Sequence, residues 1–236
     1  MVGQRRRPRN ELGQYDDLVD EWWKQEGEFA ALHWLARARA QVIPPSPSPQ
    51  ALLVDVGCGG GILAAHVHGY VHVGVDLSWS ALRVAAAKGV VVLHGDAGAL
   101  PVATGVADVV VAGEVLEHVA HLEPVVAEVS RVLRPGGVVA VDTINNTRLA
   151  RLALVTLGEH MPGGPPKGIH DPDLFVPPGR LVELFDSHGV QLRVWGLRPS
   201  TADYLRFLVG RRGPVGMVAT RSLAGVYQGV GRKVGL

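Results

Sequence analysis

Short apolar runs alternate with amphipathic stretches between residues 51 and 143. Runs rich in β-branched residues predict strands, and apolar residues at helical spacing predict helices between them. The predicted strands are 51–56, 71–75, 90–93, 107–112 and 138–143, and the helices are 61–68, 79–88 and 123–133. This alternation predicts an α/β fold with a parallel sheet covered on both faces, because the connecting helices pack against the sheet.

The flanking segments predict a helical cap and an irregular insert. Helical spacing at 15–43 ends at a Pro/Ser linker, and clustered prolines break the pattern near 145–177. Residues 178–187 are then expected to form a helix and 190–197 a strand. We divide the chain into a disordered basic tail (1–14), the cap (15–43) and one α/β domain (50–236) that carries the insert. The pattern assigns no role to 199–236.

The composition is that of a folded protein with little overall charge. The 236 residues are 47% hydrophobic and carry a net charge of +1, so the charge gives no argument for nucleic acid as a partner. The single cysteine, Cys58, excludes an internal disulfide and is typical of a reducing, cytoplasmic setting. No apolar run approaches a membrane span, but the run at 149–157 is suited to weak contact with a membrane surface.

A glycine-rich turn, Asp55-Val56-Gly57-Cys58-Gly59-Gly60-Gly61, follows the first predicted strand. A dinucleotide site needs the spacing G-x-G-x-x-G, so that a pyrophosphate meets the helix N-terminus. Here the carboxylate of Asp55 would repel a pyrophosphate and attract a sulfonium or ammonium group. The turn therefore favours S-adenosylmethionine over NAD. A phosphate-binding Walker loop is excluded, because no Gly-Lys-Ser/Thr follows.

Acidic residues follow the next three strands at the same edge of the sheet. Asp76 stands where an acid accepts hydrogen bonds from ribose hydroxyls, and Asp96 stands where a carboxylate can take the adenine amino group. Each of the two, taken singly, is equally explained as a helix N-cap. Their order along the sheet favours a cofactor site. The expected cofactor contacts are Asp55, Gly57, Gly59, Gly61, Asp76, Leu77, Asp96, Ala97, Gly113 and Glu114.

Motifs beyond the glycine-rich turn carry a family resemblance. The turn resembles motif I of class I S-adenosylmethionine-dependent methyltransferases, and Leu133-Arg134-Pro135-Gly136-Gly137 resembles their turn before the fifth strand. Other segments resemble the ubiquinone-biosynthesis O-methyltransferase family: Trp22-Trp23, 26–29, Leu32-His33, Arg39, 114–119 and 166–171. The resemblance implies a Rossmann-like fold with a mostly parallel, seven-stranded sheet. It also implies that Arg39 contacts the cofactor, whose carboxylate fits a guanidinium group; otherwise Arg39 is an ordinary surface arginine.

The chain departs from that family in two places. The family usually carries Asn-Pro before the arginine, where this chain has Ala36-Arg37-Ala38, and the residues after 199 match nothing in it. The expected acceptor is therefore a phenolic or catechol small molecule, either a quinone precursor or a natural product of secondary metabolism. N- or C-methyl transfer to a small molecule and a non-catalytic nucleotide-binding module are the alternatives.

Methyl transfer to a phenol oxygen also removes a proton, so a base or a metal is expected near the acceptor. Glu114, Glu117 and His118 are spaced i, i+3 and i+4 and would share one face of a helix. Two carboxylates and an imidazole there would suit Mg²⁺, and the resembling family is associated with such a site. Without a metal, His118 is the expected base, beside Glu117, and His170 is a second candidate. The insert is expected to cover a hydrophobic aromatic acceptor.

Overall fold

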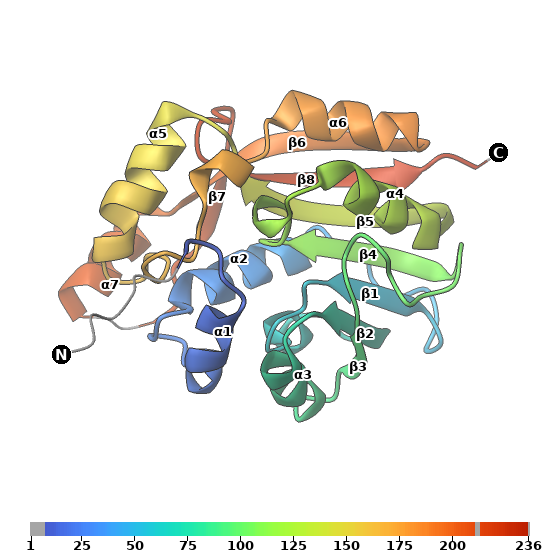
Figure 1. Ribbon diagram of the computed structural model, residues 1–236, viewed down its shortest axis with the longest axis horizontal. Coiled ribbons are helices and arrows are strands. Elements are labelled where there is room, and N and C mark those ends of the chain that lie inside the picture. Colours follow the sequence, from blue (N-terminus) through green and yellow to red (C-terminus); the bar gives the residue numbers. More distant parts are fainter. Residues whose placement is uncertain (1–7, 211–212, 236) are drawn as a thin grey trace.

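The strands of the protein form one eight-stranded sheet with the order β3-β2-β1-β4-β5-β8-β6-β7 (Figure 1). They are β1 (Leu52–Val56), β2 (Val71–Asp76), β3 (Val91–His94), β4 (Ala107–Gly113), β5 (Leu133–Ile144), β6 (Val190–Pro199), β7 (Met217–Thr220) and β8 (Val226–Lys233). The first five pair in parallel, whereas β8 runs antiparallel to β5 and β6, and β7 antiparallel to β6. The computed structural model describes residues 8–210 and 213–235.

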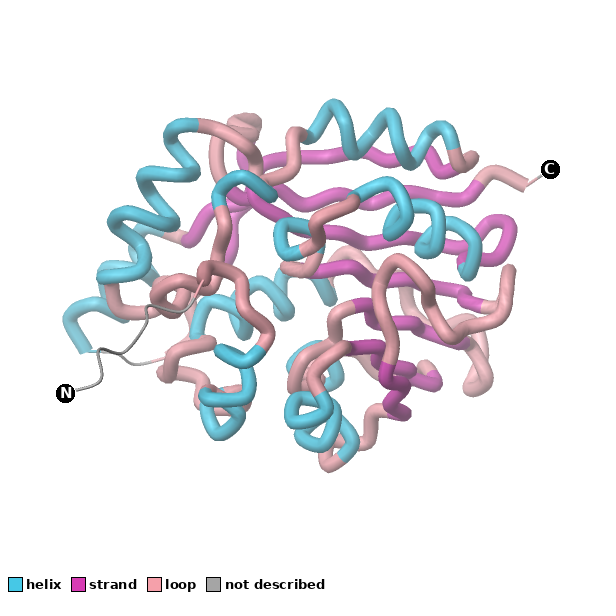
Figure 2. Tube along the Cα trace, in the orientation of Figure 1, coloured by secondary structure: helices cyan, strands magenta, loops and turns pink. Residues whose placement is uncertain are grey.

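The helices pack on the faces of this sheet and at its edges (Figures 1 and 2). They are α1 (Gly13–Asp17), α2 (Ala30–Ala40), α3 (Trp79–Ala86), α4 (Leu122–Val132), α5 (Arg148–Ala150), α6 (Pro178–Ser187) and α7 (Thr201–Gly210). Short 3₁₀ turns are η1 (Val19–Glu21), η2 (Ile62–Ala65), η3 (Leu116–His118), η5 (Gly158–His160) and η6 (Pro172–Leu174), and η4 (Arg151–Leu157) is π-helical. The two α-helices of residues 51–143, α3 and α4, lie within about two residues of their predicted positions.

The central strands contribute to a core on each side of the sheet, because successive side chains of a strand point to opposite faces. Val54 and Val110 belong to the core that α4 and α6 cover, together with Phe185. Leu53 and Val109 belong to a second core on the other face. All these side chains are at most 1% exposed. Burial on both faces explains why these strands are continuous apolar runs rather than alternating ones.

The strand count of seven was wrong, because β7 adds an edge strand that pairs with Gly196–Pro199 of β6. The segment that the pattern left without a role forms α7, β7 and β8. Glycines explain why β8 was not predicted, since they lower the β-propensity of a sequence. A Cβ on Gly229 or Gly231 would lie 3.0 Å from neighbouring side-chain or backbone atoms, so the close approach of β5 and β6 favours glycine there.

Two helical segments also differ from the prediction. The helix expected at 61–68 is reduced to η2, and the chain then turns at Gly69, whose φ of +82° lies in the left-handed region. Conversely, the part of the insert expected to be irregular contains a continuous helical run over 148–160. The hydroxyl of Thr147 accepts a hydrogen bond from the backbone N–H of Ala150 and so caps its first turn.

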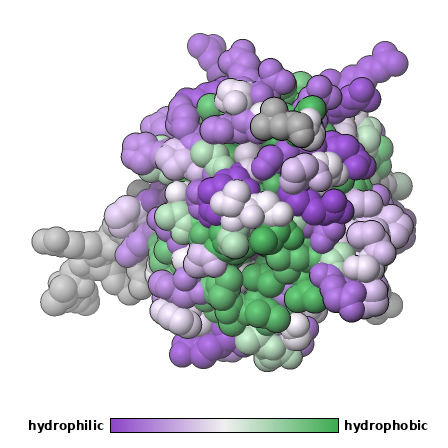
Figure 3. Space-filling view, turned by 90° about the vertical axis from the view of Figure 1, so that its right-hand side faces the viewer, coloured by the Kyte–Doolittle hydropathy of each residue, from purple (hydrophilic) through white to green (hydrophobic). Residues whose placement is uncertain are grey.

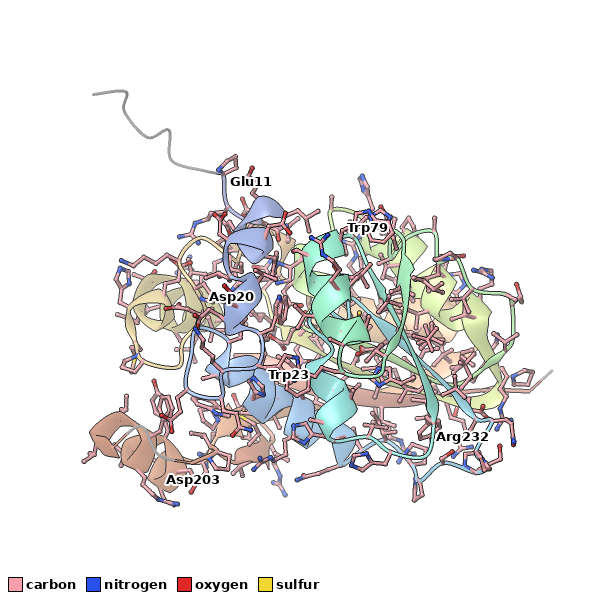
Figure 4. The ribbon with its side chains drawn as sticks, turned by 90° about the horizontal axis from the view of Figure 1, so that it is seen from below. Glu11, Asp20, Trp23, Trp79, Asp203 and Arg232 are labelled. Atoms are coloured by element: carbon pink, nitrogen blue, oxygen red, sulfur yellow. The ribbon has the colours of Figure 1, made fainter. Side chains whose placement is uncertain are left out.

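The N-terminal segment lies against the end of the sheet rather than apart from it. Residues 1–7 of the tail expected to be disordered lie outside the described residues, but the chain from residue 8 onward contacts the rest of the protein. Figure 4 shows this segment, marked by Glu11 and Asp20, beside α3, whose first residue is Trp79. Asp16 accepts hydrogen bonds from the hydroxyls of Ser78, at 3.0 Å, and Ser80. The predicted boundary at residue 14 therefore does not separate a free tail from a folded cap.

The two ends of the sheet differ in character. Figure 3 shows the end where the parallel strands begin, with apolar side chains gathered in its lower half. Val71 and Val91, the first residues of β2 and β3, are 41% and 54% exposed. The opposite end carries the acidic residues and the cavity described below. Among the described residues, no helix has both the length and the apolar character needed to cross a membrane.

Candidate active site

A cavity of about 1020 Å³ lies where β1, β2 and β4 end. Ligands of open α/β sheets bind at this edge, outside the carboxyl ends of the strands. Most of the predicted cofactor contacts line it: Arg39, Asp55, Gly57, Gly59, Asp76, Leu77, Asp96, Ala97, Gly113 and Glu114. Gly61 is not part of the cavity wall, because it faces α3; a Cβ there would lie 3.0 Å from the Cβ of Ala85.

The glycine-rich turn needs its glycines for two separate reasons. Gly57 and Gly59 have φ values of 68° and 50°, in the left-handed region that side chains with a Cβ disfavour. In addition, the ring of Trp22 lies directly on the turn, so that a Cβ on Gly59 would come within 2.4 Å of it. Trp22 is 5% exposed and stacks on Phe29, with ring centroids 4.4 Å apart. The N-terminal segment thus packs directly on the glycine-rich turn.

Asp76 is held by the backbone on both sides of its carboxylate. Its Oδ2 accepts the N–H of Gly59 and its Oδ1 accepts the N–H of Ser78, each at 2.8 Å. Burial raises the pKa of Asp76, while these two hydrogen bonds counteract that shift. Each carboxylate oxygen can accept a further hydrogen bond. Asp76 is therefore oriented in advance and retains the acceptor capacity that a ribose diol requires.

The other two acids at the strand ends have different surroundings. Asp55 is 4% exposed, and its Oδ2 lies 3.3 Å from Nε2 of His72 on β2. Asp96 is exposed, and its Oδ1 accepts the N–H of Gly98 at 2.7 Å within the loop after β3. Both line the cavity. The hydrogen bond to Gly98 is also what a capping role would give, so the contact of Asp96 with an adenine stays a prediction.

Arg39 forms a buried ion pair that the sequence did not indicate. Its Nε and Nη2 donate to the two carboxylate oxygens of Asp142 at 2.6 and 2.5 Å. The guanidinium lies directly on Gly113, where a Cβ would come within 1.8 Å of Cζ. Arg39 thus reaches the end of β4, and the bidentate contact does not involve its Nη1. Contact with the cofactor carboxylate stays a prediction. One sequence feature could have indicated this ion pair: Asp142 is an acid within an apolar strand, and a buried acid needs a buried partner.

His118 lies at the end of η3, on the cavity wall, and is held by the N-terminal segment. Its Nδ1 is 2.6 Å from Oδ1 of Asn10, and its Nε2 is 3.3 Å from the hydroxyl of Tyr15. The ring stacks on that of His170, with centroids 5.1 Å apart. Burial lowers the pKa of His118 to about 4 and also lowers that of His170. Both imidazoles are therefore neutral at pH 7, which is the form that binds metals or accepts protons.

The carboxyl group of Glu117 lies beside this histidine pair, and the half-buried Glu114 interacts with Glu117. Glu117 is 0% exposed, and its Oε2 accepts the hydroxyl of Thr143 at 2.7 Å. Burial raises the pKa of Glu117 to about 7. Burial also raises the pKa of Glu114, and the charge on Glu117 raises it further. Such shifted carboxyl groups are concentrated at functional sites, because a buried carboxylate that keeps its charge needs a partner such as a cation, and one without a partner takes up a proton.

Within the described residues, Glu117, His118 and His170 form a group that can hold a metal ion. Each offers one ligand atom, and these atoms lie within 4.8 Å of one another. Two of the three predicted ligands belong to this group, but Glu114 does not. The helix face expected to hold all three does not form, because η3 begins only at Leu116 and Glu114 has a φ of 53°. The third member, His170, comes from the insert instead.

Comparison with known proteins identifies the family. Residues 54–141 match a methyltransferase domain. The ubiquinone biosynthesis O-methyltransferase of Cupriavidus pinatubonensis is 35% identical over 193 residues, which cover 77% of this chain and 77% of that protein. The enzyme of the same name from Ralstonia nicotianae is 34% identical over 224 residues, or 86% and 94% of the two chains. The chain belongs to the ubiquinone biosynthesis O-methyltransferase family.

As a member of this family, the protein is an S-adenosylmethionine-dependent methyltransferase, as the glycine-rich turn and the acids had predicted. The alternatives of an NAD site and of a non-catalytic module are excluded. A methyltransferase of Thermotoga maritima, described as a possible histamine N-methyltransferase, superposes with a TM-score of 0.67 at 18% identity. The superposition covers 93% of this chain and 96% of that one and confirms the class I fold.

Several residues at the site of this family member were not predicted. Asn10 lies in the tail expected to be disordered, where no periodicity marks it. Tyr15 begins the helical cap, and its sequence gives no signal of its partner beyond its aromatic character. Thr143 ends a predicted strand, where a hydroxyl among apolar residues indicates a buried partner. Each of these residues forms a hydrogen bond with a residue that is distant in the sequence, so the local sequence pattern does not reveal its partner.

Proposed function

We propose that the protein transfers a methyl group to an oxygen of a phenolic or catechol-type quinone precursor, and that Glu117, His118 and His170 activate this oxygen. The observation that carries this proposal is a pair of neutral imidazoles, His118 and His170, on the wall of the cavity that also contains the glycine-rich turn, with a carboxylate oxygen of the buried Glu117 within 4.8 Å of them. The relatives are named as ubiquinone biosynthesis O-methyltransferases, which supports the acceptor class. A phenolic natural product would have the same chemistry.

The bound cofactor supplies an electrophilic methyl group. We assign Asp76 to its ribose, Asp96 with Ala97 and Leu77 to its adenine, and Gly113 with Glu114 to its methionine part. This assignment follows the order of the strand ends around the cavity. Asp55 adds a negative charge near the turn, which attracts the cationic cofactor more than its neutral product.

The group formed by Glu117, His118 and His170 fits a divalent cation. Oε1 of Glu117 and Nδ1 of His170 are buried and have no hydrogen-bond partner among the described residues. A cation would satisfy such atoms and would lower the pKa of an acceptor hydroxyl. Mg²⁺ prefers oxygen ligands, whereas two imidazoles and one carboxylate also suit Mn²⁺ or Zn²⁺. Without a cation, His118 and Glu117 are the groups available to take the hydroxyl proton.

The insert supplies the apolar part of the acceptor site. Leu154, Met161 and Ile169 line the cavity from the helical run 148–160 and the residues that follow it. Ile169 is 4% exposed and directly precedes His170, so the same segment provides apolar contact and a polar group. An aromatic ring with one or two hydroxyls fits such walls.

A methyl-transfer assay tests the proposed function. The full chain is incubated with S-adenosylmethionine carrying a deuterated methyl group and with a catechol, a monophenol, an aryl amine or a dimethoxybenzene. We expect mass spectrometry to find the label on an oxygen of the catechol, and no product from the dimethoxybenzene. A labelled amine or a labelled ring carbon, with no labelled oxygen, would overturn the O-transfer proposal in favour of N- or C-transfer.

We further propose that the outer face of the helical run 148–160 touches a bilayer surface, from which a prenylated acceptor reaches the cavity. Leu149, Leu152 and Leu157 are 58%, 50% and 52% exposed, beside the exposed Arg148, which would favour anionic lipid. Leu154 of the same run lines the cavity. The same helical run therefore carries both the exposed leucines and a residue of the cavity wall.

Vesicle flotation tests this contact. We expect Leu152→Glu to lower binding to anionic vesicles about tenfold, because burying a leucine contributes about 1.5–3 kcal/mol. Val91→Glu is the matched control, since Val91 is 54% exposed at the opposite end of the sheet. Equal losses in both variants, or no flotation of the unmodified protein, would contradict the proposal.

A further inference from the structure

The side-chain amide of Asn10 contacts His118 at two points. Its Nδ2 donates to the backbone carbonyl of His118 at 2.9 Å, and its Oδ1 lies 2.6 Å from Nδ1 of the ring. A carbonyl oxygen only accepts hydrogen bonds, so the first contact fixes which end of the amide is the NH₂ group. The oxygen of the amide therefore faces Nδ1.

This orientation determines where the imidazole carries its proton. Because Oδ1 of Asn10 is an acceptor, Nδ1 of His118 must be the protonated ring nitrogen. In a neutral ring the other nitrogen, Nε2, then carries the lone pair and accepts hydrogen bonds. The hydroxyl of Tyr15, at 3.3 Å, is placed to donate to it. Nε2 is thus the nitrogen of His118 that remains able to accept a proton or bind a cation.

Asn10 itself is held by the segment that supplies His170. Its backbone has a φ of 59°, a left-handed conformation that asparagine tolerates better than most residues. Its N–H donates to the carbonyl of Gly168 at 3.0 Å. The preceding Arg9 donates to the carbonyl of His170 at 2.9 Å and pairs with Glu159. The position of Asn10 is therefore fixed by its own backbone hydrogen bond and by the ion pair of the neighbouring Arg9, as well as by the contacts of its side chain with His118.

We propose that Asn10 is a positioning residue, which selects the Nδ1–H tautomer of His118 and so keeps the lone pair of this imidazole on Nε2, where the acceptor or a cation can take the place of the Tyr15 hydroxyl. The proposal rests on the proposed role of His118 in activating the acceptor. Asn10 lies outside residues 54–141, which match the methyltransferase domain, so the positioning group comes from the N-terminal segment of this chain. In metal sites, a partner on the second imidazole nitrogen has the same effect on ring orientation.

The test is nitrogen NMR of the full chain with ¹⁵N-labelled histidine side chains, with the signals of His118 assigned by their loss in His118→Gln. We expect Nδ1 to show the shift of a protonated nitrogen and Nε2 that of an unprotonated one. In Asn10→Ala the two shifts should move toward those of free histidine, in which the other tautomer predominates. Asn10→Asp retains an acceptor for Nδ1–H and should keep the original pattern.

Kinetics provide a second readout. We expect Asn10→Ala to lower kcat by about tenfold to a hundredfold, with little change in KM for the cofactor. A loss of this size is usual when a residue that hydrogen-bonds to a metal ligand or a catalytic base is removed. Asn10→Asp should recover part of this loss. Gln14→Ala is the matched control: Gln14 belongs to the same segment and donates to the carbonyl of Pro8, at 3.3 Å, rather than to His118.

The possible results distinguish the proposed role of Asn10 from the proposed role of His118, on which it rests. An unprotonated Nδ1 in the unmodified protein, or identical spectra for Asn10→Ala and the unmodified protein, overturns the role of Asn10. Full turnover of His118→Ala with a catechol would instead overturn the proposed role of His118, whatever the tautomer. Spectra that change equally in Asn10→Ala and Gln14→Ala would show a general loosening of the segment and would also contradict a specific role for Asn10.

Discussion

Replacing Asp76 by alanine is expected to weaken the binding of S-adenosylmethionine about 100-fold or more. The carboxylate is held by the N–H groups of Gly59 and Ser78, so its free acceptor sites are fixed at the cavity. Each charge-assisted hydrogen bond to a ribose hydroxyl contributes about 1.5–3 kcal/mol, and a tenfold change in affinity corresponds to about 1.4 kcal/mol. Isothermal titration calorimetry with S-adenosylmethionine and S-adenosylhomocysteine measures the effect.

Asp96→Ala is the matched control for this experiment. Asp96 also follows a strand of the sheet and lines the cavity, but it is exposed, so that a hydrogen bond from it competes with water. We expect less than about tenfold weaker binding in this variant. Thermal unfolding without ligand shows whether each variant is folded. Unchanged affinity in a folded Asp76→Ala protein would remove the assignment of this residue to the ribose.

The part of the fold that the sequence predicted best is the part in which local pattern and burial agree. The strands of residues 51–143 are apolar runs with a turn after each, and the central ones, β1, β4 and β5, are buried on both faces. The acids at their ends were predicted for the same reason, because parallel strands bring their carboxyl ends to one edge of the sheet. Asp55, Asp76 and Asp96 accordingly all line the cavity.

The parts that could not be predicted depend on contacts between distant residues or on unusual backbone. The ion pair of Arg39 with Asp142 joins α2 to β5, and neither residue shows its partner in the sequence. The left-handed φ of Glu114 removed it from the expected ligand face, although its spacing was correct. His170 was expected only as a second base, and its packing against His118 depends on how the insert folds back.

The insert also shows where the family resemblance added information. The motif at 166–171 indicates His170 as a candidate base, although no periodicity supports that segment. The N-terminal tail has no such motif before Trp22, and its contacts with His118 were missed. The local sequence pattern thus predicts the part of the cavity assigned to the cofactor. The part assigned to the acceptor is formed by segments with little regular structure, for which that pattern gives no signal.

Glu117→Gln and His118→Ala are expected to lower turnover about 100-fold or more while leaving cofactor affinity within about twofold. The reason is that both residues lie at the proposed acceptor site, where a base or metal ligand contributes about 10²–10⁴-fold to rate. Glutamine keeps the shape of Glu117 and an acceptor for the hydroxyl of Thr143, but it cannot carry a negative charge. Steady-state kinetics with a catechol and calorimetry with the cofactor measure the two quantities separately.

Chelation then distinguishes a cation from a base. If a cation is held by Glu117, His118 and His170, treatment with EDTA should abolish turnover of the unmodified protein, and Mg²⁺, Mn²⁺ or Zn²⁺ should restore it. The same additions should not restore Glu117→Gln. Glu123→Gln, in an exposed acid at the start of α4, should behave as the unmodified protein. Turnover that resists EDTA but is lost in both site variants would assign Glu117 and His118 to proton transfer alone. Normal rates in both variants would contradict the proposed acceptor site, because Glu117, His118 and His170 are the only group of this kind found among the described residues.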